Sequence, residues 1–155
     1  MKILIAVDTS EFAEAAVNAV IGQFSPHGSE VRVFHAADWE QHLPLAYQFA
    51  QGTDAAHAVI SLRDQILRQA DDHVRQMAAR LRAAGFAVTT ETVPEGDPRT
   101  AILDAADKWP AELIVVGSHG RSGLDRFLLG SVSERIVRHA PCSVEVVRPS
   151  PPRAA

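Results

Sequence analysis

The sequence predicts an α/β fold of the Rossmann-like kind, a three-layer α/β/α sandwich built on a parallel sheet. Five short apolar stretches alternate with stretches whose apolar residues recur every three or four positions, the spacing of an amphipathic helix. Strands that alternate with helices form parallel sheets through right-handed crossovers. Most of the apolar stretches are also unbroken, which is typical of strands that are covered on both faces.

The first strand is predicted at residues 3–7, an apolar run that ends at Asp8. Thr9 or Ser10 can then cap a helix. The second strand is predicted at residues 31–36. The apolar face of the intervening helix consists of Phe12, Ala15, Ala16, Ala19 and Val20.

A long helix is predicted to begin at an Asp54 cap and to end at Gly85, and a third strand follows at residues 86–93. The segment 39–53 before this helix matches no pattern. The apolar stripe of the helix is expected to be core, and it consists of Leu62, Ile66, Ala70, Val74, Met77 and Leu81.

Asp97 and Pro98 read as a cap followed by proline at the first helical position, and the fourth strand is predicted at residues 113–116. Ser131 and Glu134 have the spacing of a capping box that opens the last helix. The helix after Pro98 is expected to bury Ile102, Leu103 and Ala106.

The fifth strand is predicted at residues 144–147, which completes a single domain over residues 1–148. The proline-rich tail, residues 149–155, is expected to be disordered.

Composition and charge limit the partners and the cellular location that we expect for the protein. The chain has 155 residues and a formal net charge of −4, which argues against nucleic acid as a partner because phosphate backbones require a clustered positive face. Cys142 is the single cysteine, so no internal disulfide can form. We expect a cytoplasmic protein, since no apolar run approaches the length of a membrane span and the start of the chain does not resemble a signal peptide.

A glycine-rich stretch follows the fourth strand directly. It contains Gly117, Gly120 and Gly123, and then Gly130 immediately before Ser131. Glycines let backbone N–H groups approach an anion, and the next helix offers unpaired N–H donors and the positive end of its dipole. The stretch therefore predicts a phosphate-binding turn, with a nucleotide as its ligand.

The position of this turn in the predicted sheet supports the same hypothesis. Asp8, His35, Ala36 and Gly117 all lie where a strand ends. In open parallel sheets, ligands bind outside the carboxyl ends of the strands. The glycine turn is therefore predicted at the edge where a ligand belongs.

Several side chains near this edge have two possible roles. Asp8 can cap the first helix or accept a hydrogen bond from ribose or adenine, but its carboxylate would repel phosphate. Ser131 can cap its helix with Glu134 or donate to phosphate. Arg121 suits a phosphate better than His119 does, because it keeps its charge at any working pH.

The sequence contains no motif for a protein metal site, for the two common nucleotide-binding loops or for catalysis. The seven histidines are scattered, so a protein metal site is not expected, and Mg²⁺ would be held mainly by nucleotide phosphates. No Gly-x₄-Gly-Lys-Ser/Thr motif occurs, and no Gly-x-Gly-x-x-Gly follows the first strand. No nucleophile stands at a recognisable spacing from a base, so no catalytic residue is predicted.

Taken together, these segments resemble the universal stress protein family over residues 1–148. The resemblance is strongest in the family's ATP signature, two glycines separated by two residues, then nine residues, then Gly-Ser or Gly-Thr. The segments that match are Asp8–Glu11, Phe34–Ala36, Gly96–Pro98, Gly117, Gly120, Gly130–Ser131 and Ala140–Cys142.

The resemblance implies the ATP-binding branch of the family, with a five-stranded parallel sheet of order 3-2-1-4-5 and a homodimer paired through the last strand. Glu145 departs from the apolar residue usual there and weakens the expected dimer, since charges on edge strands discourage pairing. The implied contacts to adenine and ribose are Asp8 and the backbone near Ala6 and Ala36. The implied contacts to the phosphates are Gly117, Ser118, His119, Gly120, Arg121, Ser122, Gly123, Gly130, Ser131, Val132 and Ser133.

The sequence leaves three possible functions for the chain. The first is an ATP-binding stress-response regulatory protein with slow ATP hydrolysis at most. The second is a nucleotide-free interaction module of the same fold. The third is an ATP pyrophosphatase-like enzyme, which ranks lowest because the glycines such enzymes carry after the first strand are missing beside Asp8.

Overall fold

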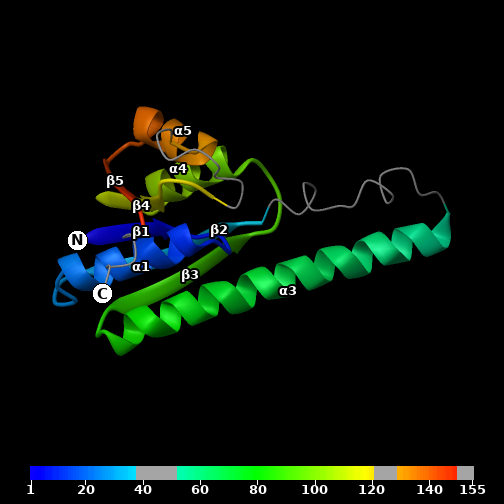
Figure 1. The fold of residues 1–155 in the computed structure, drawn as a ribbon, viewed down its shortest axis with the longest axis horizontal. Coiled ribbons are helices and arrows are strands. Elements are labelled where there is room, and N and C mark those ends of the chain that lie inside the picture. Colours follow the sequence, from blue (N-terminus) through cyan, green and yellow to red (C-terminus); the bar gives the residue numbers. More distant parts are fainter. Residues whose placement is uncertain (38–51, 121–128, 150–155) are drawn as a thin grey trace, which may run out of the picture.

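A computed structural model describes residues 1–37, 52–120 and 129–149. The elements in chain order are β1 (Lys2–Ala6), α1 (Glu11–Gln23), β2 (Glu30–Ala36), α3 (Thr53–Ala83), β3 (Ala87–Val93), α4 (Pro98–Lys108), β4 (Leu113–Gly117), α5 (Ser131–His139) and β5 (Ser143–Val147) (Figure 1). Each predicted strand and helix is present, with bounds that differ by one or two residues at most ends.

The five strands form one parallel sheet of order β3-β2-β1-β4-β5, which confirms the predicted order. In β1, Ile3 pairs with Val31 of β2 on one side and with Leu113 of β4 on the other. Helices α1 and α3 cover one face of the sheet, and α4 and α5 cover the other (Figure 1). The α/β/α layering is therefore as expected.

Two hydrophobic cores lie on opposite faces of this sheet, and β1 contributes to both. Ile3 and Ile5 are fully buried against α1 and α3, whereas Leu4 is fully buried on the side of α4 and α5. A strand whose side chains are buried on both faces must be apolar throughout. This explains the unbroken apolar run at the start of the chain.

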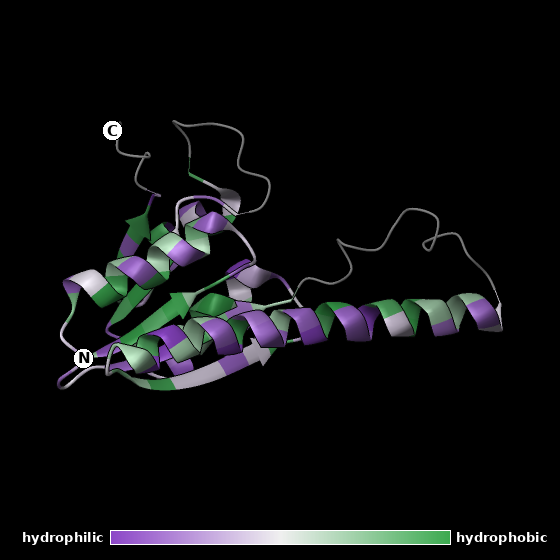
Figure 2. Cartoon of the chain, turned by 60° about the horizontal axis from the view of Figure 1, so that its bottom comes forward, coloured by the Kyte–Doolittle hydropathy of each residue, from purple (hydrophilic) through white to green (hydrophobic). Residues whose placement is uncertain are grey.

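Helix α3 is only half supported by the sheet. Its buried residues begin at Ala70 and continue to Leu81, whereas Leu62 and Ile66 are half-buried and Ile60 is 55% exposed. Figures 1 and 2 show the first half of the helix extending past the sheet, and Figure 2 shows that this half carries both apolar and polar residues. The prediction that the whole stripe is core is therefore wrong for its first two members, because no strand lies beneath them.

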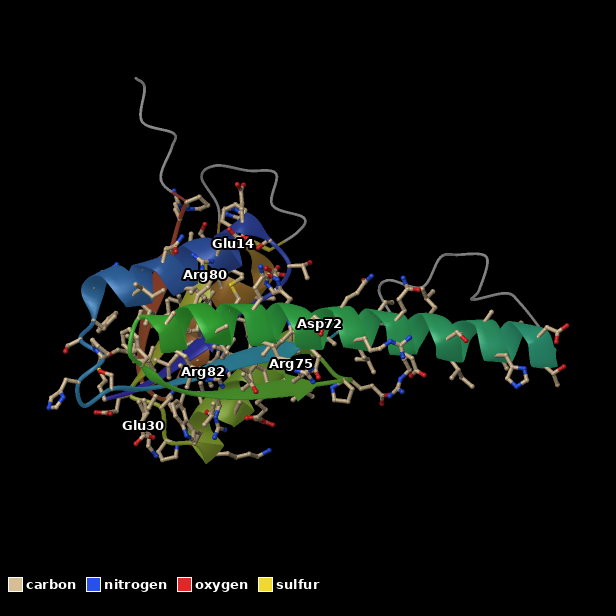
Figure 3. The ribbon with its side chains drawn as sticks, turned by 90° about the horizontal axis from the view of Figure 1, so that it is seen from below. Glu14, Glu30, Asp72, Arg75, Arg80 and Arg82 are labelled. Atoms are coloured by element: carbon tan, nitrogen blue, oxygen red, sulfur yellow. The ribbon has the colours of Figure 1, made fainter. Side chains whose placement is uncertain are left out.

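The outer side of α3 is charged. Arg75 lies 3.0 Å from Asp71 and 4.0 Å from Asp72. The side chains of Arg75 and Asp72 are largely exposed (Figure 3), whereas Asp71 also accepts from the Thr92 hydroxyl of β3. In the first half of α3, Arg63 forms an ion pair of 2.8 Å with Glu95, which follows β3. Polar contacts of this kind add little stability at an exposed surface.

The starts of the helices match the sequence to different degrees. Asp97 caps α4 through its side chain, as predicted. Ser10 occupies the predicted N-cap position of α1, but its hydroxyl donates to Asp8 and makes no capping bond. Helix α3 begins after Gly52, so Asp54 lies in its first turn and does not cap it. Within the described residues, no helix is long and apolar enough to cross a membrane.

Candidate functional site

The carboxyl ends of β1 and β4 lie side by side in the middle of the sheet. Strand β1 continues toward β2 on one side, whereas β4 continues toward β5 on the other, so the strand order reverses between them. A reversal of this kind separates the two outgoing connections and leaves a crevice at the sheet edge. The two turns that follow β1 and β4 therefore border the candidate site.

The turn after β1 is closed by Asp8. One of its carboxylate oxygens, Oδ1, accepts from the backbone N–H of Ser10 at 3.0 Å and also from the Ser10 hydroxyl. The preceding carbonyl, of Val7, accepts from Nδ1 of the buried His35 at 2.6 Å. Asp8 thus orders the turn before α1 but does not cap the helix, because Ser10 stands at the N-cap position, and its second oxygen takes no part in these two bonds.

The turn after β4 is tied to its neighbours by three hydrogen bonds. The Ser118 N–H donates to Val147 at the end of β5 at 2.7 Å, and the Gly130 N–H donates to the Ser118 carbonyl at 2.8 Å. The buried hydroxyl of Ser133 donates to the Gly117 carbonyl at 2.7 Å. The first turn of α5 is therefore fastened directly to the end of β4.

The glycines of this turn are required by close packing. A Cβ on Gly117 would lie 2.6 Å from Cβ of Phe12, and one on Gly120 would lie 2.9 Å from Oδ2 of Asp8. A Cβ on Gly130 would lie 3.2 Å from Cα of His119. None of the three has the positive φ angle that glycine alone adopts easily. They let the two turns approach each other.

Helix α5 begins without a side-chain cap. Gly130 is its N-cap residue, and the first intrahelical bond runs from the Glu134 N–H to the Gly130 carbonyl at 2.9 Å. Ser131 is already helical, one position too late to cap, so the predicted capping box is wrong. The Glu134 carboxylate instead binds Arg138 at 2.8 Å.

The backbone N–H groups around this site fall into two sets. Those of Ser118 and Gly130 donate to protein carbonyls. Within the described residues, the N–H groups of His119, Gly120 and residues 131–133 have no partner. The Gly120 nitrogen lies 3.8 Å from the position of a Gly130 Cβ, so the turn after β4 lies beside the residue that precedes α5.

Two side chains not predicted as site residues support this arrangement. Phe12, in the first turn of α1, lies under Gly117, and its ring centroid is 5.3 Å from that of His119. The His119 Nδ1 is also 3.1 Å from the Ser118 hydroxyl. An apolar residue at the start of a helix reads as core in any sequence, so no signal distinguished Phe12. His35 is the second, and the sequence placed it only at the end of a strand.

The remaining predicted site residues are placed as follows. Ala6 and Ala36 are the last residues of β1 and β2 and lie at the same edge. Val132 packs against the core under α4 and α5. Arg121, Ser122 and Gly123 lie outside the described residues.

Among the residues that the structure describes, this edge holds neither a group of potential metal ligands nor a reactive thiol. Within residues 1–37, 52–120 and 129–149, no three His, Cys, Asp or Glu side chains gather to hold a metal ion. Cys142 packs against the second core, and burial raises the pKa of its thiol. Cys142 thus packs as a small apolar residue.

A separate cleft of about 280 Å³ lies between β3 and α4 and is lined by several carboxylates. Three of them already have cationic partners. Glu91 pairs with Arg32, Glu95 with Arg63, and Asp97 with Arg99, each at 2.8 Å. This neutralisation leaves the cleft a poor site for a cation.

Comparison with known proteins places this fold and these turns in one family. The model of the universal stress protein family matches residues 1–148. A universal stress protein from Synechocystis is 29% identical over 95% of this chain and 97% of its own. One from Methanocaldococcus jannaschii is 33% identical over 95% of this chain and 81% of its own.

Solved structures agree. The hypothetical protein MJ0577 superposes with a TM-score of 0.81 at 27% identity, over 96% of both chains. Two more distant neighbours, which share the fold, were solved with nucleotides. One universal stress protein is in complex with cAMP (TM-score 0.58, 24% identity) and one from Archaeoglobus fulgidus is in complex with dAMP (TM-score 0.66, 21% identity), each over 95% of this chain. This chain belongs to the universal stress protein family.

Proposed function

We propose that the chain is an ATP-binding regulatory protein of the stress response, with the nucleotide at the carboxyl ends of β1 and β4. The observation that carries the proposal is the uncapped start of α5, whose N–H groups have no partner among the described residues and follow directly on Gly130, the residue that lies beside His119 and Gly120. Open amides at a helix start, together with the positive end of the helix dipole, form an anion site.

The phosphates would lie over α5. The N–H groups of residues 131–133 donate to them from one side, and those of His119 and Gly120 donate from the other. Ser118 and Gly130 contribute by holding the turn, since their own N–H groups are engaged with protein carbonyls. Arg121, with Ser122 and Gly123, completes the phosphate contacts, and Mg²⁺ is held mainly by the phosphates.

The nucleoside would lie toward β1 and β2. Oδ2 of Asp8 is free of the hydrogen bonds that occupy Oδ1, and it accepts from ribose or adenine. The backbone near Ala6 and Ala36 borders the same space. Two family members in complex with adenine mononucleotides support adenine as the base.

Occupancy by ATP would change the surface that residues 120–129 present, and that change would carry the signal. A ligand shifts such an equilibrium only through different affinities for the two states. Hydrolysis is slow at most, because no described side chain at the site is placed to activate water. We propose a cytoplasmic location for this activity and no role for nucleic acid.

We also propose a homodimer through β5, an open edge strand. The Glu145 carboxylate, which the sequence suggested as an obstacle, accepts from the Gln23 side chain of α1 at 3.0 Å. The charge is thus directed over one face of the sheet. The hydrogen-bonding groups at the strand edge stay available for pairing. Light scattering of the purified chain tests this directly, and a monomeric mass would reject it.

Calorimetric titration with ATP, with and without Mg²⁺, tests the nucleotide proposal. Wild type should bind, and Gly120→Val and Gly130→Val should lose binding, because each added side chain enters the space between the two turns. Gly22→Val is the matched control, since a Cβ at Gly22 meets nothing within 4 Å.

The alternatives give different results in the same experiment. No heat with wild-type protein would favour a nucleotide-free interaction module. Rapid release of pyrophosphate would favour an ATP pyrophosphatase-like enzyme. A raised ratio of absorbance at 260 nm to that at 280 nm in the purified protein would show that a nucleotide is carried along.

A further inference from the structure

The hydrogen-bond ladder between β1 and β2 stops at an unusual place. Val7, just past β1, donates its N–H to the Phe34 carbonyl at 2.9 Å, as in a continuing parallel ladder. In that pattern the next bond would run from the Ala36 N–H to the Val7 carbonyl. Neither this bond nor any other to the Ala36 N–H occurs within the described residues.

A side chain takes the place of the missing backbone donor. Nδ1 of His35 lies 2.6 Å from the Val7 carbonyl oxygen, and only 6% of His35 is exposed. A carbonyl can only accept, so Nδ1 must carry the proton of this hydrogen bond. The Val7 carbonyl is therefore satisfied without Ala36.

The Ala36 N–H is left facing the candidate site. Residues two apart in a strand present their backbone groups to the same neighbour, and Phe34 presents its carbonyl to the β1 side. Ala36 must do the same, at a level where β1 has already ended. On the other side, the Ala37 N–H donates to Val93 at 2.8 Å, which keeps this end of β2 attached to β3.

We propose that His35 is a positioning residue that ends the β1–β2 ladder one bond early and so leaves the Ala36 N–H to the nucleoside. The inference rests on the proposed function, because it needs a nucleotide at this edge. Half-buried backbone donors are normally paired, so an open one beside a ligand space requires a group that keeps it open. The imidazole is that group.

Three substitutions separate this role from simple packing. In His35→Asn the amide nitrogen is as many bonds from Cα as Nδ1 is, so the donor to Val7 is kept. In His35→Gln the amide nitrogen takes the more distant place of Nε2, so the donor is lost while polarity is retained. His35→Leu removes the donor altogether.

Two measurements are made on each variant. The first is amide hydrogen exchange at Ala36 without nucleotide, where His35→Leu and His35→Gln should slow exchange about tenfold as the Ala36 N–H bonds to Val7. The second is calorimetric affinity for ATP, which should weaken about three- to tenfold in the same two variants. His35→Asn should stay within about twofold of wild type in both.

Inorganic triphosphate serves as the control ligand, and its affinity should be the same in all four proteins. Unchanged Ala36 exchange, or unchanged ATP affinity, in His35→Leu and His35→Gln would overturn the assignment while the proposed function stands. Wild-type protein that does not bind ATP would overturn both. If His35→Leu does not fold, the Asn and Gln variants decide the question by themselves.

Discussion

Helices α4 and α5 lie on the same face of the sheet and start at the same edge, but their first turns are completed differently. In α4, the Asp97 carboxylate accepts from the Arg99 N–H at 3.2 Å, and proline at the first position has no N–H to satisfy. In α5, Gly130 provides no side chain, and the N–H groups of residues 131–133 have no partner among the described residues.

The difference separates a structural helix start from one that is available to a ligand. An unpaired helix start near the protein surface is tolerated at a cost, which a bound anion would remove. The following substitutions change either the capped start of α4 or the uncapped start of α5, or the contacts that support them.

The largest effect is expected from Gly117→Ala, which removes the support of the open helix start. The new Cβ would lie 2.6 Å from Cβ of Phe12 and 3.0 Å from its backbone, so α1 and the turn must separate. We expect a loss of about 3 kcal/mol in the free energy of unfolding, measured by urea denaturation. Gly22→Ala is the matched control and should gain about 0.5–1 kcal/mol, because alanine reduces the conformational entropy of the unfolded chain and its Cβ meets nothing within 4 Å in α1. Equal effects of the two changes would contradict this packing argument.

Ser131→Asp should place a carboxylate in the first turn of α5, where it meets the positive end of the helix dipole although it stands one position after the N-cap. The side chain is exposed, so the change should fit and should stabilise the first turn by a few tenths of a kcal/mol. A carboxylate so close to the phosphates should weaken ATP binding about thirtyfold, or about 2 kcal/mol. Ser131→Asn has the same size without the charge and should bind nearly as well as wild type. Calorimetry on the pair decides the matter, and equal affinities would show that the phosphates do not lie over α5.

Ser133→Ala breaks the bond that fastens α5 to β4. Its hydroxyl is 2% exposed and donates to the Gly117 carbonyl, which would be left without this partner. The free energy of unfolding should fall by about 1.5 kcal/mol. Ser131→Ala provides the contrast, because within the described part of the chain the Ser131 hydroxyl caps nothing, and its effect on thermal unfolding should be close to zero.

The smallest effect concerns the capped helix. Asp97→Ala should cost about 0.5–1 kcal/mol at neutral pH through loss of the cap. The pKa of Asp97 is lowered below its ordinary value of 3.8, mainly by the hydrogen bond from the Arg99 side chain. The stabilisation is thus complete above pH 3.8 and is lost as the pH falls through the lower folded value. The difference in stability between wild type and Asp97→Ala should shrink over that acidic range. The side chain in Asp97→Asn caps without titrating, so the difference in stability between Asp97→Asn and Asp97→Ala should not change there.

The sequence predicted the fold well because the hydrophobic periodicity and the positions of capping residues, glycines and prolines indicated the same elements. The apolar runs at the starts of β1 and β4 identified central strands, since only strands covered on both faces need to be apolar throughout. The strand order came from the family resemblance, because spacing alone does not say which strands are neighbours.

The site was less predictable, for three physical reasons. A one-residue shift in the start of α5 decides whether Ser131 caps, and helix boundaries are not fixed so finely by sequence. The packing of Gly117 on Phe12 joins segments far apart in the chain. The Val7 carbonyl is satisfied by a side chain of the neighbouring strand, which no local pattern reports.

The uneven support of α3 has a consequence for its stability. Its second half is fastened by buried side chains between Ala70 and Leu81, whereas in its first half, among the residues that the structure describes, no side chain is buried. Unsupported helical segments of this length are only marginally stable in water. The first turns should therefore melt at temperatures where the rest of the molecule is intact, so circular dichroism would record gradual helix loss before the cooperative transition.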